Sequence, residues 1–257
     1  MIRLSVNVNK VATLRNARGG DVPDVCEAVA VCVQAGAPGI TVHPRADERH
    51  ITRRDVAEVA AHLHASAAGV EFNIEGDPTA DFVDLVVAAR PQQCTLVPVA
   101  PGEVTSQAGW SASTSPERLV AVIARLHAEN IRVSVFVDPE EAPIRWAKRL
   151  GADRVELYTE PFAKAFASSR ESGRSSFETY AAASTLAHSL GLGVNAGHDL
   201  DLANLEVFRE LPHLDEVSIG HALIAHALYV GLDRAVRDYL AAVNGREDQL
   251  SSTQVLT

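Results

Sequence analysis

The stretch that decides the fold is RVSVFVDPEEAPIRWAKRLGADRVELY, residues 132–158, which contains one complete strand–helix–strand unit. The β-branched run Arg132–Val137 predicts a buried strand, and the apolar spacing over Pro139–Leu150 predicts a helix. Gly151 follows the last helical residue, as is common at helix ends, and Arg154–Tyr158 predicts the next strand. Two strands joined through a helix pair in parallel, so the sequence predicts an α/β fold with a parallel sheet.

The same unit recurs along the chain. Strands are predicted at Ile2–Val8, Gly39–His43, Val70–Ile74, Gln93–Val97, Arg132–Val137, Arg154–Tyr158, Gly193–Ala196 and Glu216–Ile219. Helices are predicted at Asp24–Ala35, Asp55–Ala67, Ala80–Ala88, Ser115–Glu129, Pro139–Leu150, Ser175–Ser189, Leu202–Glu210 and Ala222–Val243. Eight such pairs close most simply into a (β/α)8 TIM barrel, which predicts one domain over residues 1–243 and a loosely ordered polar tail over 244–257. The alternative is an open doubly wound sheet, which usually has a Gly-rich turn after its first strand, and Val8-Asn9-Lys10-Val11 contains no glycine.

The composition limits which binding partners and which cellular compartment are expected. Of the 257 residues 47% are hydrophobic, enough for one large core, and the formal net charge is −10. This acidic balance argues against a nucleic-acid partner, although a local group of arginines still binds phosphate. The first residues lack the apolar segment of a signal peptide, and no apolar run approaches the ~18 residues that span a bilayer. Because Cys26, Cys32 and Cys94 also lack metal-ligand spacing, we expect a cytoplasmic protein with no membrane partner.

Polar and ionisable residues collect where the predicted strands end. In chain order they are Asn7, Asn9, His43, Asn73, Glu75, Asp138, Glu156, Asn195, His198 and His221. The carboxyl ends of all strands in a TIM barrel meet at one rim, which is where such enzymes have their active sites. A single histidine at a strand end is more often structural than catalytic, but convergence on one rim favours a shared acid–base site. Histidine transfers protons near neutral pH, and so does a glutamate with a raised pKa.

Two groups of residues are candidate phosphate sites. Gly197-His198-Asp199 and Gly220-His221 follow the seventh and eighth strands, where backbone N–H groups of TIM barrels often bind phosphate. These glycines are also compatible with tight turns alone. The second group is basic, is expected on the loops after the first two strands, and comprises Arg15, Arg18, Arg45, Arg49 and His50. Two anion sites suit two phosphorylated substrates or one substrate with two phosphates.

Metal and Schiff-base chemistry have weaker support. His62-Leu63-His64 lies in a predicted helix, where residues two apart point to different faces, so no metal site is expected there. Lys164 is placed in a loop, so only Lys10 lies near a strand end. A metal-dependent hydrolase or aldolase stays an alternative, with the ligands His43, Glu75, Glu156, His198 and His221. A second alternative is a catalytically silent barrel that binds a phosphorylated metabolite, although binding alone does not need two histidines and a glutamate together.

Four motifs of the chain resemble the pyridoxine 5'-phosphate synthase family. They are Asn7-Val-Asn-Lys-Val-Ala-Thr-Leu-Arg-Asn-Ala-Arg-Gly19, Gly39-Ile-Thr-Val-His-Pro-Arg45 with Arg49-His-Ile-Thr52, Val194-Asn-Ala-Gly-His198, and Ile219-Gly-His-Ala222. The resemblance implies a (β/α)8 barrel with extra helices that condenses 3-amino-2-oxopropyl phosphate with 1-deoxy-D-xylulose 5-phosphate. The implied products are pyridoxine 5'-phosphate, inorganic phosphate and water. It also implies no metal or organic cofactor, and a homo-oligomer that is usually an octamer.

The resemblance further implies a role for each matching residue. His43 corresponds to the general base, Glu75 to its acid–base partner, His198 to the proton donor and Glu156 to a residue that stabilises the transition state. The residues implied to hold the amino-ketone phosphate are Asn7, Asp199, Gly220 and His221. Those implied to hold the xylulose phosphate are Arg45, His50 and Thr105.

Three further expectations follow from the resemblance. Arg18, expected on a loop, matches an arginine that reaches a neighbouring subunit. Asn9-Lys10 stands where many members have Asp-His, and Lys10 is expected either to hold the xylulose phosphate or to be a solvated lysine. The long segment Pro98–Thr114 is expected to be either a lid over the site or a surface loop.

Overall fold

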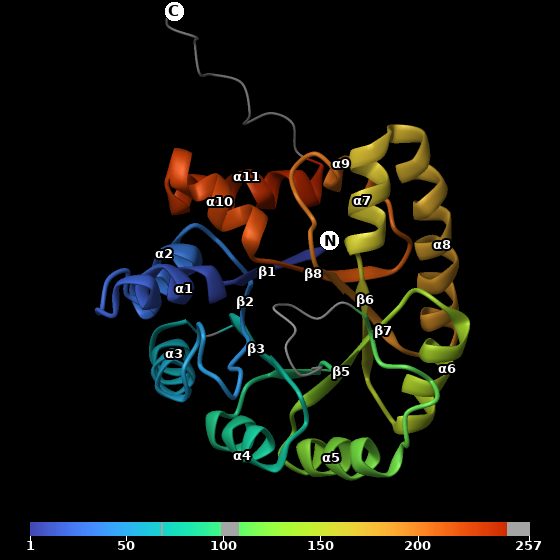
Figure 1. Cartoon of the computed structure of the whole chain (residues 1–257), viewed down its shortest axis with the longest axis horizontal. Helices are drawn as coiled ribbons and strands as arrows, with labels where there is room; N and C mark the ends of the chain where they lie inside the picture. Colours follow the sequence, from blue (N-terminus) through green and yellow to red (C-terminus); the bar gives the residue numbers. More distant parts are fainter. Residues whose placement is uncertain (68, 99–107, 246–257) are drawn as a thin grey trace, which may run out of the picture.

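The computed structural model describes residues 1–67, 69–98 and 108–245 and shows a closed parallel barrel (Figure 1). Its strands follow one another in chain order, and β8 pairs with β1. They are β1 (Arg3–Asn7), β2 (Gly39–Val42), β3 (Glu71–Gly76), β4 (Gln93–Leu96), β5 (Arg132–Val137), β6 (Arg154–Tyr158), β7 (Gly193–Gly197) and β8 (Leu214–Ile219). The predicted (β/α)8 TIM barrel is confirmed, and the open doubly wound sheet is wrong.

Helices surround the barrel on its outer face (Figure 1). They are α1 (Asn9–Arg18), α2 (Val25–Gln34), α3 (Arg53–Ser66), α4 (Ala80–Ala89), α5 (Glu117–Ala128), α6 (Glu141–Leu150), α7 (Glu160–Ser168), α8 (Arg170–Ser189), α9 (Leu205–Phe208), α10 (His221–Val230) and α11 (Leu232–Asn244). More than one helix follows β1, β6 and β8, which gives the barrel its extra helices. No helix in the described part of the chain is long and apolar enough to cross a membrane.

Two helices and one break differ from the sequence prediction. Arg15 and Arg18 lie on α1 rather than on a loop, and Lys164 lies on α7 rather than on a loop. The predicted helix Ala222–Val243 is divided at Gly231, whose φ of 84° does not fit an α-helix. The predicted polar tail stays a prediction, because α11 ends at Asn244 and residues 246–257 lie outside the described part of the chain.

The interior of the barrel is polar rather than filled with aliphatic side chains alone. Buried side chains from four neighbouring strands form a continuous chain of hydrogen bonds. Ser5 and Thr41 hydroxyls lie 2.7 Å apart, Asn73 Nδ2 donates to Thr41 Oγ1 at 3.2 Å, and Thr95 Oγ1 donates to Asn73 Oδ1 at 3.1 Å. Because each of these four side chains has a hydrogen-bond partner, the chain fixes their positions beneath the site.

Arginines close the N-terminal end of the barrel, called the base below. Arg132 Nη2 lies 2.5 Å from Glu71 Oε1, and Arg3 lies 3.9 Å from Glu216. Arg154 Nη1 donates to Asn195 Oδ1 at 2.7 Å. The base therefore holds its buried carboxylates next to fixed positive charges.

Candidate active site

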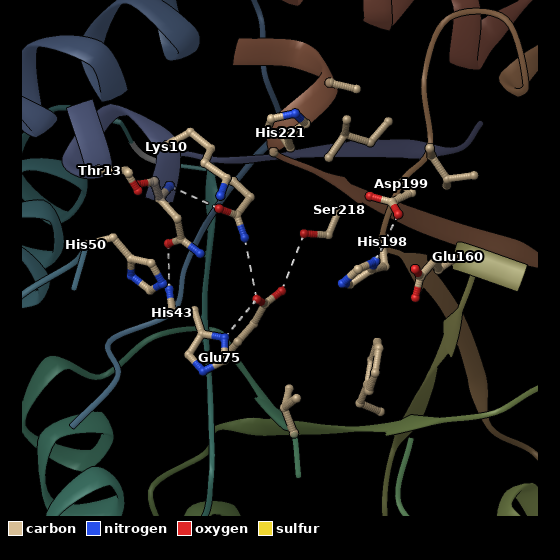
Figure 2. Close-up of a pocket in the computed structure, with 18 of the residues that line it drawn as sticks. Lys10, Thr13, His43, His50, Glu75, Glu160, His198, Asp199, Ser218 and His221 are labelled. Atoms are coloured by element: carbon tan, nitrogen blue, oxygen red, sulfur yellow. Dashed lines mark hydrogen bonds and ion pairs between the residues drawn. The ribbon is translucent and has the colours of Figure 1, made fainter. Parts of the chain in front are cut away.

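A cavity of about 540 Å³ lies at the C-terminal ends of the strands, called the mouth below (Figure 2). Predicted site residues that line it are Asn7, Asn9, Lys10, His43, Arg45, His50, Glu75, Glu156, His198, Asp199, Gly220 and His221. Arg18 is exposed on α1 and does not line the cavity. Thr105 lies outside the described residues, as does most of the predicted lid. The structure thus brings twelve of the fourteen predicted site residues to one cavity.

Glu75 lies at the centre of this cavity (Figure 2). Its Oε2 lies 3.8 Å from Nδ1 of His43 and accepts a long hydrogen bond from Asn7 Nδ2 at 3.5 Å. Ser218 Oγ donates to the other oxygen at 3.4 Å. Burial and the neighbouring charge of Glu156 raise the pKa of Glu75 well above its usual value. Glu75 therefore holds its proton more tightly than a glutamate in water does.

His43 follows β2 and is held through its own backbone. Its amide donates to Asn9 Oδ1 at 2.9 Å, and the amide of Asn9 donates to Asn7 Oδ1 at 3.0 Å. Burial, followed by the positive charges of His50 and Arg45, lowers the pKa of His43 to about 3. A histidine that stays neutral is a proton acceptor, so the electrostatics suit His43 to the role of a base.

His50 faces His43, and the geometry fixes its tautomer. Nδ1 of His50 accepts a hydrogen bond of 2.9 Å from the amide of Ile51, and burial is the main reason that its pKa falls to about 4. The neutral ring therefore has its proton on Nε2, which makes that atom a donor. Arg15 and Asn16 of α1 donate to the carbonyl oxygen of His50 at 3.3 and 2.9 Å, so helix α1 positions the segment that carries this ring.

Glu156 is a second buried carboxyl group at the mouth. Burial and the charge of Glu216 raise its pKa to about 8, so Glu156 also binds a proton at neutral pH. A side chain at Gly197 would collide with Oε1 of Glu156. The glycine of the Asn195-Ala196-Gly197-His198 motif thus lets Glu156 keep its position, which a larger residue would displace.

His198 and Asp199 occupy a turn with an unusual backbone. Their φ angles are 89° and 61°, in the positive region that non-glycine residues rarely adopt. Thr159 holds this turn, because its hydroxyl contacts the carbonyl oxygens of Gly197 and His198. Asn204 Nδ2 also donates to the Asp199 carbonyl at 3.0 Å. Such strain is typical of functional sites, and here it directs the His198 ring into the cavity (Figure 2).

The sequence analysis missed several lining residues, among them Ser218, Phe136, Val97 and Glu160. Ser218 contacts Glu75, and Phe136 and Val97 form an apolar part of the wall. Glu160, the first residue of α7, lies with His198 and Asp199 in a group whose ligand atoms are all within 4.8 Å of one another. Such a group has the atoms to hold a cation, and the unrecognised helix α7 is the reason that Glu160 was missed.

The fold and this cavity define a class of protein, a (β/α)8-barrel enzyme with a buried acid–base centre at the mouth. Similar solved structures include 3-hexulose-6-phosphate synthase, with 14% identity, a TM-score of 0.61 and coverage of 94% of this chain and 99% of that chain. Phosphoribosylanthranilate isomerase from Thermotoga maritima is similar too, with 14% identity, a TM-score of 0.59 and coverage of 95% and 100%. At this identity the likeness concerns the fold alone.

Sequence comparisons identify the particular family. The family model described as pyridoxal phosphate biosynthesis protein PdxJ matches residues 4–245. The pyridoxine 5'-phosphate synthase of Porphyromonas gingivalis is 53% identical over 240 residues, which cover 93% of this chain and 98% of that protein. The synthase of Leptospira biflexa is 48% identical over 254 residues, covering 95% and 98%. The chain belongs to the PdxJ family, which confirms the resemblance and the assignment to vitamin B6 biosynthesis.

Proposed function

We propose that this protein condenses 3-amino-2-oxopropyl phosphate with 1-deoxy-D-xylulose 5-phosphate to give pyridoxine 5'-phosphate, phosphate and water. The observation that carries the proposal is the contact between His43 and Glu75, 3.8 Å apart in a buried cavity, with the pKa of His43 lowered and the pKa of Glu75 raised. The reaction consists of proton transfers, because an amine condenses with a ketone, carbon acids lose protons, and water and phosphate leave. A base and an acid that are both ready near neutral pH meet that need.

The catalytic roles follow from the protonation states and positions. His43 accepts protons from carbon. Glu75, whose Oε2 lies 3.8 Å from Nδ1 of His43, exchanges protons with the same intermediate. His198 donates a proton to the leaving oxygen from the other wall of the cavity. Glu156, buried and protonated, donates a hydrogen bond to negative charge that develops in the transition state.

The substrates are held by different walls. Lys10, Arg45 and the Nε2 donor of His50 bind the xylulose phosphate, together with Asn9 and Thr105. On the other wall, α10 begins at His221, directly after Gly220, and both residues line the cavity, so the first backbone N–H groups of α10 are candidates to bind the phosphate. Asn7 and Asp199 complete the contacts of the amino-ketone phosphate.

Arg18 requires a second subunit to take part in binding. It lies at the exposed end of α1 and outside the cavity of its own chain. We therefore propose a homo-oligomer in which Arg18 reaches the site of a neighbour. Light scattering checks this assembly, and a fully active monomer contradicts it. The octamer size and the cytoplasmic location stay predictions.

The direct test is an assay of the purified protein with both substrates, in which pyridoxine 5'-phosphate is followed by its absorbance. Product formation that persists in EDTA supports acid–base catalysis without a metal. Activity that disappears with chelator and returns with zinc or magnesium supports the metal-dependent alternative instead. Tight binding of a phosphorylated substrate with no turnover supports the catalytically silent barrel.

A further inference from the structure

The walls of the cavity carry opposite charges. On the side of β1 and β2 lie the cationic side chains Lys10, Arg45 and Arg49. On the side of β6 and β7 lie the carboxylates Glu160 and Asp199 (Figure 2). A ligand with two phosphate groups and nothing positive fits the first wall but is repelled by the second.

The acidic wall has a defined geometry around His198. Ligand atoms of Glu160, His198 and Asp199 all lie within 4.8 Å of one another. Nδ1 of His198 is buried without a hydrogen-bond partner among the described residues, and it lies 3.6 Å from Asp199 Oδ2. That contact is too long for a regular hydrogen bond. It is nevertheless the main reason that the pKa of Asp199 is lowered, so Asp199 is an anion at neutral pH. A buried nitrogen and two carboxylates thus converge on one small volume.

Neighbouring cations compensate only part of this negative charge. Lys164 Nζ lies 2.5 Å from Glu160 Oε1, one helical turn along α7. His221 on α10 is the other positively chargeable group that acts on Asp199 besides His198 and Lys164. With Lys164 taken into account, two carboxylates leave about one negative charge, which matches a single ammonium group.

We propose that Glu160 and Asp199 bind the amino group of 3-amino-2-oxopropyl phosphate in its ammonium form, while its phosphate faces the start of α10. This inference rests on the proposed function and adds the orientation of one substrate within the cavity. An ammonium has three N–H donors, and the acidic wall offers carboxylate oxygens on two sides. The two ends of the substrate therefore reach complementary groups, the phosphate at backbone N–H groups and the amine at carboxylates.

The test compares two ligands that differ only in the amine. One is 3-amino-2-oxopropyl phosphate, and the other is 2-oxopropyl phosphate, which has hydrogen in place of the amino group. Direct titration calorimetry of each ligand against the full-length protein needs no turnover. In the wild type the amino ligand is expected to bind roughly 10- to 100-fold more tightly, as for charge-assisted hydrogen bonds.

The variants Glu160→Gln and Asp199→Asn keep the size of each side chain and remove its charge. Each is expected to weaken the amino ligand about 10-fold and to leave 2-oxopropyl phosphate unchanged, so the selectivity ratio falls toward one. Glu141→Gln is the matched control, because Glu141 also begins a helix and pairs with a cation four residues later, but it lies outside the cavity. Its ratio is expected to equal that of the wild type.

Three outcomes overturn the inference. Equal weakening of both ligands means that the carboxylates act on the phosphate or on the fold, and unchanged affinity for both ligands means that they do not contact the amine. Binding of the amino ligand that is lost in EDTA and restored by Mn²⁺ assigns the same three residues to a metal ion. Failure of the proposed function is distinguishable, because a protein that selects the amino ligand yet forms no pyridoxine 5'-phosphate keeps the inference on binding and loses the proposed reaction.

Discussion

The base and the mouth of the barrel both contain buried carboxyl groups, but their surroundings differ. At the base, Glu71 contacts Arg132, and the arginines Arg3, Arg132 and Arg154 partly offset the burial that raises the pKa of Glu216 to about 7. At the mouth, neither Glu75 nor Glu156 forms an ion pair with an arginine or lysine of the described chain. The same residue type is thus charge-compensated at one end and uncompensated at the other.

This difference separates a structural role from a chemical one. Removing a cation from the base leaves a buried charge and should cost stability. At the mouth, burial raises the pKa of Glu156 to about 8 and raises that of Glu75 well above its usual value. Glu75 and Glu156 line the cavity and Glu71 and Glu216 do not, so substitutions at the mouth should lower activity and substitutions at the base should lower stability.

The largest effect is expected at Glu75. Glu75→Gln keeps the hydrogen-bonding shape but cannot release a proton, so turnover should fall by ~100-fold or more while the fold stays intact. Steady-state kinetics and circular dichroism measure the two quantities. His198→Asn is expected to behave in the same way. Near-normal turnover in both variants would show that the acid–base assignment is wrong.

At the base, the corresponding variant is Arg132→Met. It leaves Glu71 with 11% of its side chain exposed and without its nearest cation, so the free energy of unfolding should fall by about 1–3 kcal/mol. Activity of the folded fraction should be nearly unchanged. Arg125→Met is the control, because the Arg125–Asp84 pair is about half exposed and should matter by less than ~0.5 kcal/mol. Urea titrations in which both variants match the wild type contradict the assigned role of the base.

A smaller effect is expected in the pH dependence of stability. The pKa of Glu156 is about 8 in the folded protein and lies near 4.5 in the unfolded chain, so the folded state binds the proton more tightly. Its contribution to stability is full below pH ~4.5 and is lost as the pH rises through about 8. Glu156→Gln should therefore gain stability relative to the wild type between pH 5 and pH 8, by on the order of 1–3 kcal/mol. Parallel stability curves for the two proteins would mean that Glu156 does not titrate in this way.

The barrel and most of the cavity were predictable because of the periodic pattern of the chain. Runs such as Arg132–Val137 and Arg154–Tyr158 are strands with the predicted bounds, since their β-branched residues are buried on both faces of a parallel sheet. Parallel strands end at the same rim, so naming their last polar residues also named most of the cavity.

The sequence analysis did not predict helices α1 and α7, because few of their side chains are buried. Helix α1 buries only Val11 and Ala12, and its N-terminus has no side-chain cap. Helix α7 buries only Phe162 and follows β6 almost directly. With so few buried side chains, neither helix shows the repeated buried positions along the chain that predicted the other helices. Because α7 was not predicted, Glu160 was not recognised as a site residue, and neither were the opposite charges of the two cavity walls.

The smallest effect is expected for Lys10. Its surroundings differ from those of the arginines at the base, as the surroundings of the carboxyl groups do. Arginines at the base are paired with protein carboxylates, whereas Lys10 forms no ion pair or side-chain hydrogen bond with the described residues and lines the cavity. Its charge acts on the neighbouring His50, where it helps to lower the pKa. A cation that has no partner among the described residues, in a cavity for phosphorylated substrates, is suited to bind the xylulose phosphate.

The variant Lys10→Met keeps the aliphatic stem and removes the charge. The KM for the xylulose phosphate should rise about 3- to 10-fold with kcat nearly kept, because the lost contact is made equally in the ground state and the transition state. Lys148→Met is the control, since Lys148 is exposed on α6 and lies outside the cavity. The KM difference between wild type and Lys10→Met should also shrink at high salt, where the charge is screened. A collapse of kcat would place Lys10 in the chemistry, and no change in either constant would make it a solvated lysine.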